Sequence, residues 1–220
     1  MKVMLLTLLL TVAGLTTARA ETAAEREYEL KAAFLYNYIA FVDGPRLQPP
    51  DKEGSQGDEK AVEPIVIGVI GEDPFGAALE PLEDKEVRDR PVAIRRFKGL
   101  QWNVQDDGSK IEVFPDFDQV RQCHVLFICA SERAHAQIIL DRLEGNSILT
   151  VADVPGFLDI GGTINFVIEE KKVRFDINLA AATRAKLEIR SKLLRLAKKV
   201  QETDLVEEPD DDENQAPSKD

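Results

Sequence analysis

The chain has 220 residues, of which 44% are hydrophobic, with 28 basic against 40 acidic side chains and a formal net charge of −12. This length suits one domain with tails and is enough for a sizeable hydrophobic core. The acidic balance argues against non-specific nucleic-acid binding, because such binding depends on neutralising phosphates. Two cysteines and two histidines leave little material for a zinc or iron–sulfur centre.

The first twenty residues have the three parts of a secretory signal. Lys2 gives a positive start, residues 4–15 are an uncharged apolar run, and Ala18 and Ala20 are the small residues that a signal peptidase reads. An uncleaved membrane anchor is the alternative, but the run is shorter than the roughly 20 apolar residues that a bilayer requires. We therefore expect cleavage after Ala20, localisation to the periplasm and no transmembrane span in the mature chain.

Two stretches lack apolar periodicity. Residues 43–64 are rich in proline, glycine and charge, which predicts a flexible loop inserted in the domain, with a functional lid as the alternative. Residues 202–220 hold nine acids and one lysine, and the end of the chain from residue 201 onward is predicted to be a disordered acidic tail. The folded domain is therefore expected to span residues 21–200.

The first half of the domain is predicted to alternate helix and strand. Residues 22–42 begin with helix formers and become almost wholly apolar, which predicts a helix buried on most sides. Residues 65–71 (IVIGVIG) are typical of an interior strand covered on both faces. Weaker strands are expected at 91–97 and 111–114.

A second buried strand is predicted at residues 125–129 (VLFIC). Ser131 follows this strand and is expected to cap a helix that covers residues 132–143. Residues 148–151 (ILTV) again predict a strand, which ends close to Asp153.

A hairpin pattern follows at residues 163–168 and 173–177. In its second arm the apolar side chains alternate with Arg174 and Asp176, which therefore share the opposite face. The last segment, residues 179–200, is expected to be one long helix, because four apolar residues recur at helical spacing: Ile189, Leu193, Leu196 and Val200. The predicted fold is α/β: a single domain with a mixed β-sheet flanked by helices and ending in a long C-terminal helix.

The last segment is also strongly basic. Against Glu188 alone it carries seven cations, namely Arg184, Lys186, Arg190, Lys192, Arg195, Lys198 and Lys199. Two interpretations stay open: a solvated helix face, or a surface for anionic lipid headgroups or for acidic residues of a membrane partner. The acidic tail starts immediately afterwards and could fold back to screen these charges.

Seven segments occur in one order along the chain. They are KAAFLYNYIAFV (31–42), IVIGVIGEDPFG (65–76), CHVLFICASE (123–132), ILTVADVPGF (148–157), GGTINFV (161–167), VRFDIN (173–178) and the final KLLRLAKKV. In this order they extend across residues 31–200, and with them the chain resembles the YfiR family of exported bacterial proteins. The long loop at 43–64 and the acidic tail depart from the family's pattern.

The resemblance implies a periplasmic regulatory domain without catalysis. Family members restrain an inner-membrane diguanylate cyclase by contacting its periplasmic domain, and loss of this negative regulator raises cyclic di-GMP and favours biofilm. The resemblance also implies a homodimer, since family members dimerise. The expected partner is thus the periplasmic domain of a membrane signalling protein, reached by protein–protein contact.

Cys123 and Cys129 invite a disulfide in an oxidising compartment. Six residues of extended strand span about 20 Å, however, whereas the Cα atoms of bridged cysteines lie about 4.4–6.8 Å apart. Cys129 is therefore predicted to be a buried core thiol. Cys123 could be free, linked between subunits or linked to Cys129, and a pair of redox thiols stays an alternative.

Three carboxylates and a serine follow the predicted buried strands: Asp73, Glu132, Asp153 and Ser131. Strand ends of open α/β sheets form clefts, so these residues are candidates for binding a small ligand or a partner. A metal site is not expected, because no histidine is assured among them. A catalytic triad of Ser131, His135 and Asp153 is not expected either, because no G-x-S-x-G turn exposes the serine.

Arg174 and Asp176 are two further candidates, since they lie close enough on one strand face to interact. Binding of a partner and a structural polar row beside the last segment are both open. No catalytic, cofactor-binding or metal-binding residue is predicted, and no cofactor. The alternative function, from a different class, is a periplasmic small-molecule binding protein that serves a transporter or a sensor kinase.

Overall fold

The structure, a computed structural model, describes residues 22–49, 62–83 and 85–202. The predicted signal peptide, the greater part of the predicted loop and nearly all of the acidic tail lie outside the described residues. Those three predictions are therefore not tested by the structure. The loop's first residues are described, and they are packed: Leu47 is fully buried, and Arg46 donates hydrogen bonds to the carbonyl oxygens of Arg121, Gln122 and Cys123.

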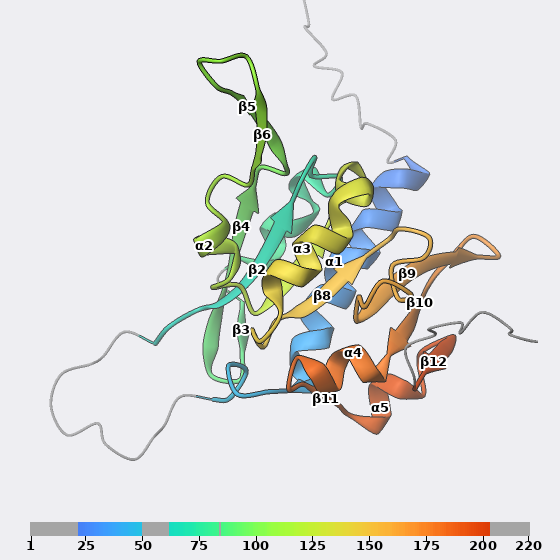
Figure 1. The fold of residues 1–220 in the computed structure, drawn as a ribbon. Coiled ribbons are helices and arrows are strands. Elements are labelled where there is room, and N and C mark those ends of the chain that lie inside the picture. The colour runs from blue at the N-terminus through green and yellow to red at the C-terminus, as the bar shows by residue number, and fades with distance from the viewer. Residues whose placement is uncertain (1–21, 50–61, 84, 203–220) are drawn as a thin grey trace, which may run out of the picture.

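The core of the fold is an eight-stranded mixed sheet with the strand order β12-β10-β9-β8-β7-β2-β4-β3 (Figure 1). Strands β4, β2, β7, β8 and β9 run parallel to one another, while β10 and β3 are antiparallel to their neighbours β9 and β4. The α/β class and the mixed sheet are as predicted. The strands are β2 (Ile65–Ile70), β3 (Glu86–Val87), β4 (Arg90–Phe97), β7 (Val125–Ile128), β8 (Leu149–Ala152), β9 (Ile164–Glu169), β10 (Lys172–Asn178) and β12 (Lys199–Gln201).

The central strands are buried on both faces, which explains their continuous apolar sequence. In β2 the side chains of Ile65, Ile67 and Val69 enter one hydrophobic cluster, and those of Val66 and Ile70 enter the other. This division follows from the alternation of side chains along a strand. The sheet therefore separates two cores, each closed by helices.

Helix α1 (Ala23–Phe41) covers the first core. Thr22 caps it, because its side chain accepts a hydrogen bond from the Glu25 amide while the Glu25 carboxylate accepts one from the Thr22 amide. Tyr38 packs against the rings of Phe166 and Phe175 on the sheet. The helix is less enclosed than predicted: Leu30 is 46% exposed, so one face only is buried.

The second core lies under two short helices, α2 (Phe117–Val120) and α3 (Ala136–Leu143). Val120 and Ile139 are the fully buried side chains that they contribute. Ser131 does not cap a long helix, contrary to prediction. Residues Ala130–His135 form the 3₁₀ helix η2, and α3 starts only at Ala136.

A two-stranded ribbon of β5 (Gln101–Val104) and β6 (Lys110–Val113) projects from the body (Figure 1). The second of these strands was expected from the sequence at 111–114. Their residues are exposed almost throughout, and Trp102, the single tryptophan of the chain, is 57% exposed.

The predicted long C-terminal helix is wrong. The segment instead forms α4 (Leu179–Arg184), β11 (Glu188–Ile189), α5 (Ser191–Leu194) and β12. Lys186 breaks the helix with a left-handed φ of 57°, and Ile189 then pairs with Val42 of β1 (Val42–Asp43). Val200 pairs with Ile177 of β10, while Leu196, placed on the buried face by the helical pattern, is 54% exposed.

Candidate functional site

The parallel strands β2, β7 and β8 end at the same edge of the sheet. Strand β2 lies between β4 and β7. After β2 the chain adds β4 on one side of it and later adds β7 on the other side. In open α/β sheets this is the position at which ligands bind. Asp73, Ser131, Glu132 and Asp153 all follow these strands, and the structure places all four at this edge.

Asp73 fixes the turn that leads from β2 into the 3₁₀ helix η1 (Gly76–Leu82). Its Oδ1 accepts a hydrogen bond from the Phe75 amide at 2.7 Å. Its Oδ2 accepts one from Arg96 Nε on β4, also at 2.7 Å. Arg96 in turn donates to the carbonyl oxygen of Gly76. Asp73 therefore joins the end of β2 to the neighbouring strand.

Ser131 joins the ends of β2 and β7. Its Oγ accepts a hydrogen bond from the Glu72 amide at 2.9 Å and donates to Glu132 Oε1 at 3.3 Å. Gly71 makes this approach possible: a Cβ at Gly71 would lie 2.4 Å from Ser131 Oγ, and its φ of +105° is one that side chains disfavour. The neighbouring His135 contacts Glu132 Oε2 and not the serine.

Glu132 is a buried carboxylate, only 6% exposed. Its Oε2 accepts a hydrogen bond from the Leu100 amide at 3.0 Å. A Cβ at Gly99 would overlap this carboxylate, so the glycine leaves the space that Glu132 fills. The side chain thus holds the segment between β4 and β5 against the end of β7.

Asp153 forms an ion pair with Lys31 of α1, and Lys31 is only 2% exposed. The distance from Lys31 Nζ to Asp153 Oδ2 is 2.7 Å, and the same oxygen accepts a hydrogen bond from the Tyr28 hydroxyl at 3.0 Å. Lys31 also pairs with Glu27 at 2.6 Å. Asp153 Oδ1 is buried without a hydrogen-bond partner. Burial, followed by the charge and hydrogen bond of Asp153, raises the pKa of Tyr28 far above its usual value.

The sequence analysis did not predict Tyr28 and Lys31 as partners of Asp153. The sequence indicates a buried cation on this helix only weakly, by one lysine beside an otherwise apolar stretch, KAAFLY. A lysine is rarely buried unless it is paired, but the sequence does not indicate which carboxylate pairs with it.

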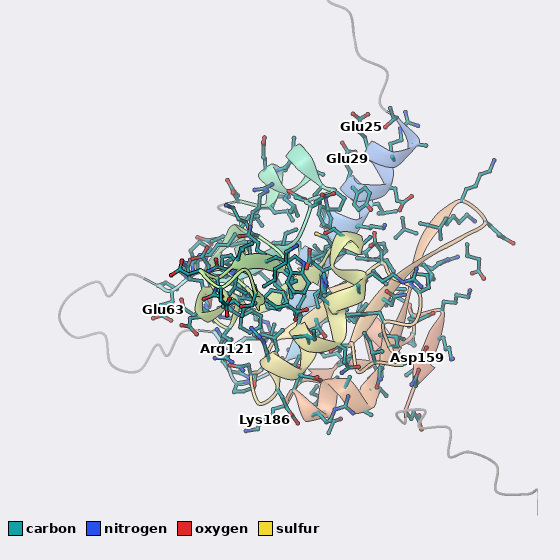
Figure 2. All side chains as sticks on the ribbon, turned by 45° about the horizontal axis from the view of Figure 1, so that its top comes forward. Glu25, Glu29, Glu63, Arg121, Asp159 and Lys186 are labelled. Carbon is teal, nitrogen blue, oxygen red and sulfur yellow. The ribbon has the colours of Figure 1, made fainter. Side chains whose placement is uncertain are left out.

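A groove of about 870 Å³ runs between the first half of α1 and η1, beside this ion pair. Its lining is mostly small or apolar, and Tyr28 and Asp73 belong to it. Glu25 and Glu29, labelled in Figure 2 at the start of α1, also line it. The apolar residues are Ala24, Ala32, Ala33, Pro74, Phe75, Ala77, Ala78, Pro81 and Leu82.

Arg174 and Asp176 lie apart from this edge. Both are on β10, where Arg174 is exposed and Asp176 is opposite Asn165 on one side and Lys199 on the other. Burial raises the pKa of Asp176, and its Oδ1 lacks a hydrogen-bond partner. A role of these two residues in binding a partner stays a prediction.

The two cysteines are unbonded and fully buried. They belong to different hydrophobic clusters: Cys129 lies in the core under α1, and Cys123 in the core under α2 and α3. Burial raises the pKa of Cys123 to about 12. The pKa of Cys129 is raised further, by burial and then by the charges of Asp73, Asp153, Glu132 and Glu72. A redox role for the thiols stays a prediction.

Within residues 22–49, 62–83 and 85–202, no three His, Cys, Asp or Glu side chains are arranged to hold a metal ion. In the same described residues, no helix is long and apolar enough to cross a membrane.

The fold and this edge define an α/β domain whose strand ends are joined to one another and to the covering helix by hydrogen-bonded polar side chains. A family model described as YfiR/HmsC-like matches residues 28–198, and the chain therefore belongs to the YfiR/HmsC-like family. The resemblance found in the sequence is thus confirmed, and membership is consistent with a regulatory role in cyclic di-GMP signalling. A comparison with curated proteins found no match.

Proposed function

We propose that this protein is an exported periplasmic regulator that restrains a membrane signalling protein, a diguanylate cyclase, by protein–protein contact. The observation that carries the proposal is the family match, which extends from α1 to the start of β12 and so includes nearly the whole described fold. The regulator acts by binding one of two states of the cyclase more tightly, which shifts the equilibrium toward that state.

The strand-end geometry supports binding over catalysis. Ser131 Oγ already accepts a hydrogen bond from the Glu72 amide. It has no hydrogen bond to His135, whose ring contacts Glu132 instead. A serine nucleophile needs a base within hydrogen-bond distance. We therefore propose that the domain is not an enzyme.

Export is supported by the sequence of residues 1–20, which has a positive start, an uncharged apolar run and small residues before the predicted cleavage point. Thr22 caps α1, so the first described helix starts directly after the predicted cleavage point at Ala20.

The test is the cellular level of cyclic di-GMP in a clean deletion of the gene. We expect the level to rise and to return when the gene is restored. A matched control restores the gene without codons for residues 2–20, which keeps the folded domain but removes its export; this version should not lower cyclic di-GMP. An unchanged level in the deletion strain would reject restraint of a cyclase.

A second function is favoured by the groove between α1 and η1. Its size, near 870 Å³, and its mainly apolar lining with Tyr28 and Asp73 are typical of a small-molecule site. In this alternative the protein binds a periplasmic small molecule for a transporter or a sensor kinase. Thermal unfolding with a panel of amino acids, sugars and fatty acids tests it, because a ligand specific to the native state raises Tm. Ala33→Trp, which fills the groove, should abolish any such shift.

A further inference from the structure

The segment that was predicted as one basic helix forms a compact cationic surface instead. We define the cationic face as a set of seven exposed residues: Arg184, Lys186, Arg190, Lys192, Arg195, Lys198 and Lys199. They lie on or between α4, β11, α5 and β12, which gather at one end of the molecule (Figure 1). Figure 2 shows Lys186 at this end, away from Glu25 and Glu29 at the start of α1. With Glu188 as the single acid, the stretch 184–199 has a net charge of +6 in a chain whose net charge is −12.

Only part of this charge is neutralised by the described fold. Arg190 forms two hydrogen bonds to Asp43, and Lys198 pairs with Glu169. Lys186 and Arg195 form no ion pair with the residues that the structure describes. Cations are often placed at a helix C-terminus because the helix dipole attracts them. This does not account for the cationic face, because α4 and α5 have only six and four residues and so have small dipoles.

The chain leaves the fold beside this face. Gln201 ends β12, is buried and is opposite Asn178. The next nineteen residues, 202–220, contain nine acids and one lysine. A segment tethered at the edge of its binding surface has an effective concentration of order millimolar. Each extended residue adds up to about 3.4 Å, so residues 204–213 can reach across the face.

We propose that the acidic segment 204–213 binds across the cationic face of the same molecule. Charge complementarity selects this occupant, since the segment has seven acids and no cation while the stretch 184–199, which carries the face, has a net charge of +6. The contact is electrostatic and exposed, so salt weakens it. The cationic face becomes open to another polyanion only when that partner displaces the segment. This inference does not depend on the identity of the regulated membrane protein.

A disulfide-trapping experiment tests the contact in the whole protein. Ser191→Cys places a thiol on the face between Arg190 and Lys192 without removing a cation, and Asn214→Cys places one directly after the acidic run. Both native thiols are buried and should not compete. Oxidised glutathione starts the reaction, and mass spectrometry follows the intramolecular disulfide at 20 mM and 500 mM NaCl. Each rate is divided by that of Ser191→Cys alone with the same reagent, which corrects for the effect of salt on the thiol.

We expect the normalised rate to fall at least fivefold at high salt. It should fall equally when Asp210, Asp211, Asp212 and Glu213 are replaced by their amides, and when Lys186 and Arg195 are replaced by glutamate. Replacing Lys98 and Lys110 by glutamate is the matched control: both are exposed and distant in sequence, the change in net charge is the same, and the rate should stay high. These three results together would support the proposal.

Equal rates in all variants, or rates that do not respond to salt, would overturn it. A second measurement asks whether the face is open. If the protein binds phosphatidylglycerol vesicles with equal affinity whether the acids of 210–213 are intact or replaced by amides, the segment does not occupy the face, and an anionic lipid surface is its partner instead. Binding that appears only after the acids are removed supports the proposal.

Discussion

Lys31 and Asp153 are 122 residues apart in the sequence, yet Lys31 Nζ and Asp153 Oδ2 lie 2.7 Å from each other in the interior. This contact attaches α1 to the end of β8. It also borders the groove beside η1, because Tyr28, which donates to the same oxygen, lines that groove. A buried ion pair of this kind is strongly destabilising to break from one side, since a charge is left without its partner.

Replacing the two partners singly should have unequal effects. Lys31→Met leaves the Asp153 carboxylate with only the Tyr28 hydroxyl, and we expect the free energy of unfolding to fall by about 3 kcal/mol. Asp153→Asn leaves Lys31 paired with Glu27, so the expected loss is smaller, about 1 kcal/mol. Urea unfolding at pH 7 measures both. A larger loss in Asp153→Asn than in Lys31→Met would contradict the assigned pairing.

The two halves of this contact differed in how far the sequence predicted them. Asp153 follows an apolar run that reads as a strand, and strand ends are where open α/β sheets place their polar groups, so its position could be predicted. The choice of Lys31 as its partner could not, because a pattern along the chain holds no information on which helix turn meets which strand end.

The C-terminal segment shows the opposite problem. Its residues are good helix formers, and Ile189 and Leu193 recur at helical spacing, so local preference favours one helix. The structure instead pairs Ile189 with Val42 and Val200 with Ile177. Both pairings are with strands distant in sequence, and such tertiary contacts override helix propensity, which is a weak determinant. By contrast the hairpin of β9 and β10 is local, and its alternating pattern predicted both strands and the buried face.

The close approach of Ser131 requires a glycine at position 71, whereas no neighbouring atom requires one at position 76. Both have positive φ, but a Cβ at Gly71 would meet Ser131 Oγ at 2.4 Å, whereas nothing lies within 4 Å of one at Gly76. Gly76→Ala should therefore cost only the backbone strain, about 1 kcal/mol, and Gly71→Ala about 3 kcal/mol, because the Ser131 bridge is lost as well. Thermal unfolding of the two variants compares them directly. Equal destabilisation would show that the approach of Ser131 does not require glycine.

His124 should make the fold sensitive to mild acid. The residue is buried and accepts a hydrogen bond from the Val66 amide at its Nδ1. Burial, and then the charges of Arg46 and Arg90, lower the pKa of His124 to about 4 from 6.5. Below pH 6.5 the unfolded chain binds a proton that the folded chain does not, so stability falls as the pH drops from about 6.5 to about 4.

The expected size of this effect is about 2 kcal/mol between pH 6.5 and pH 5, at 1.36 kcal/mol for each pKa unit. His124→Asn is the matched variant, because its amide oxygen can accept the Val66 hydrogen bond but does not titrate. Urea unfolding at pH 7.5 and pH 5.0 should show a steeper loss for the original protein than for the variant. The same loss in both would assign the acid sensitivity to carboxylates instead of His124.

The thiols of Cys123 and Cys129 should neither bridge nor react in the native protein. The two side chains belong to hydrophobic clusters on opposite faces of the sheet, and a disulfide between them would require β7 to leave the sheet. Their raised pKa also keeps them in the unreactive thiol form at neutral pH. We expect both to be alkylated by iodoacetamide at least a hundredfold more slowly in the native state than in 6 M urea.

Non-reducing mass mapping of protein purified from the periplasm should find both cysteines reduced. A Cys123–Cys129 peptide in that map would instead show that the exported chain changes its β7 region on oxidation, and would favour the redox-sensing alternative.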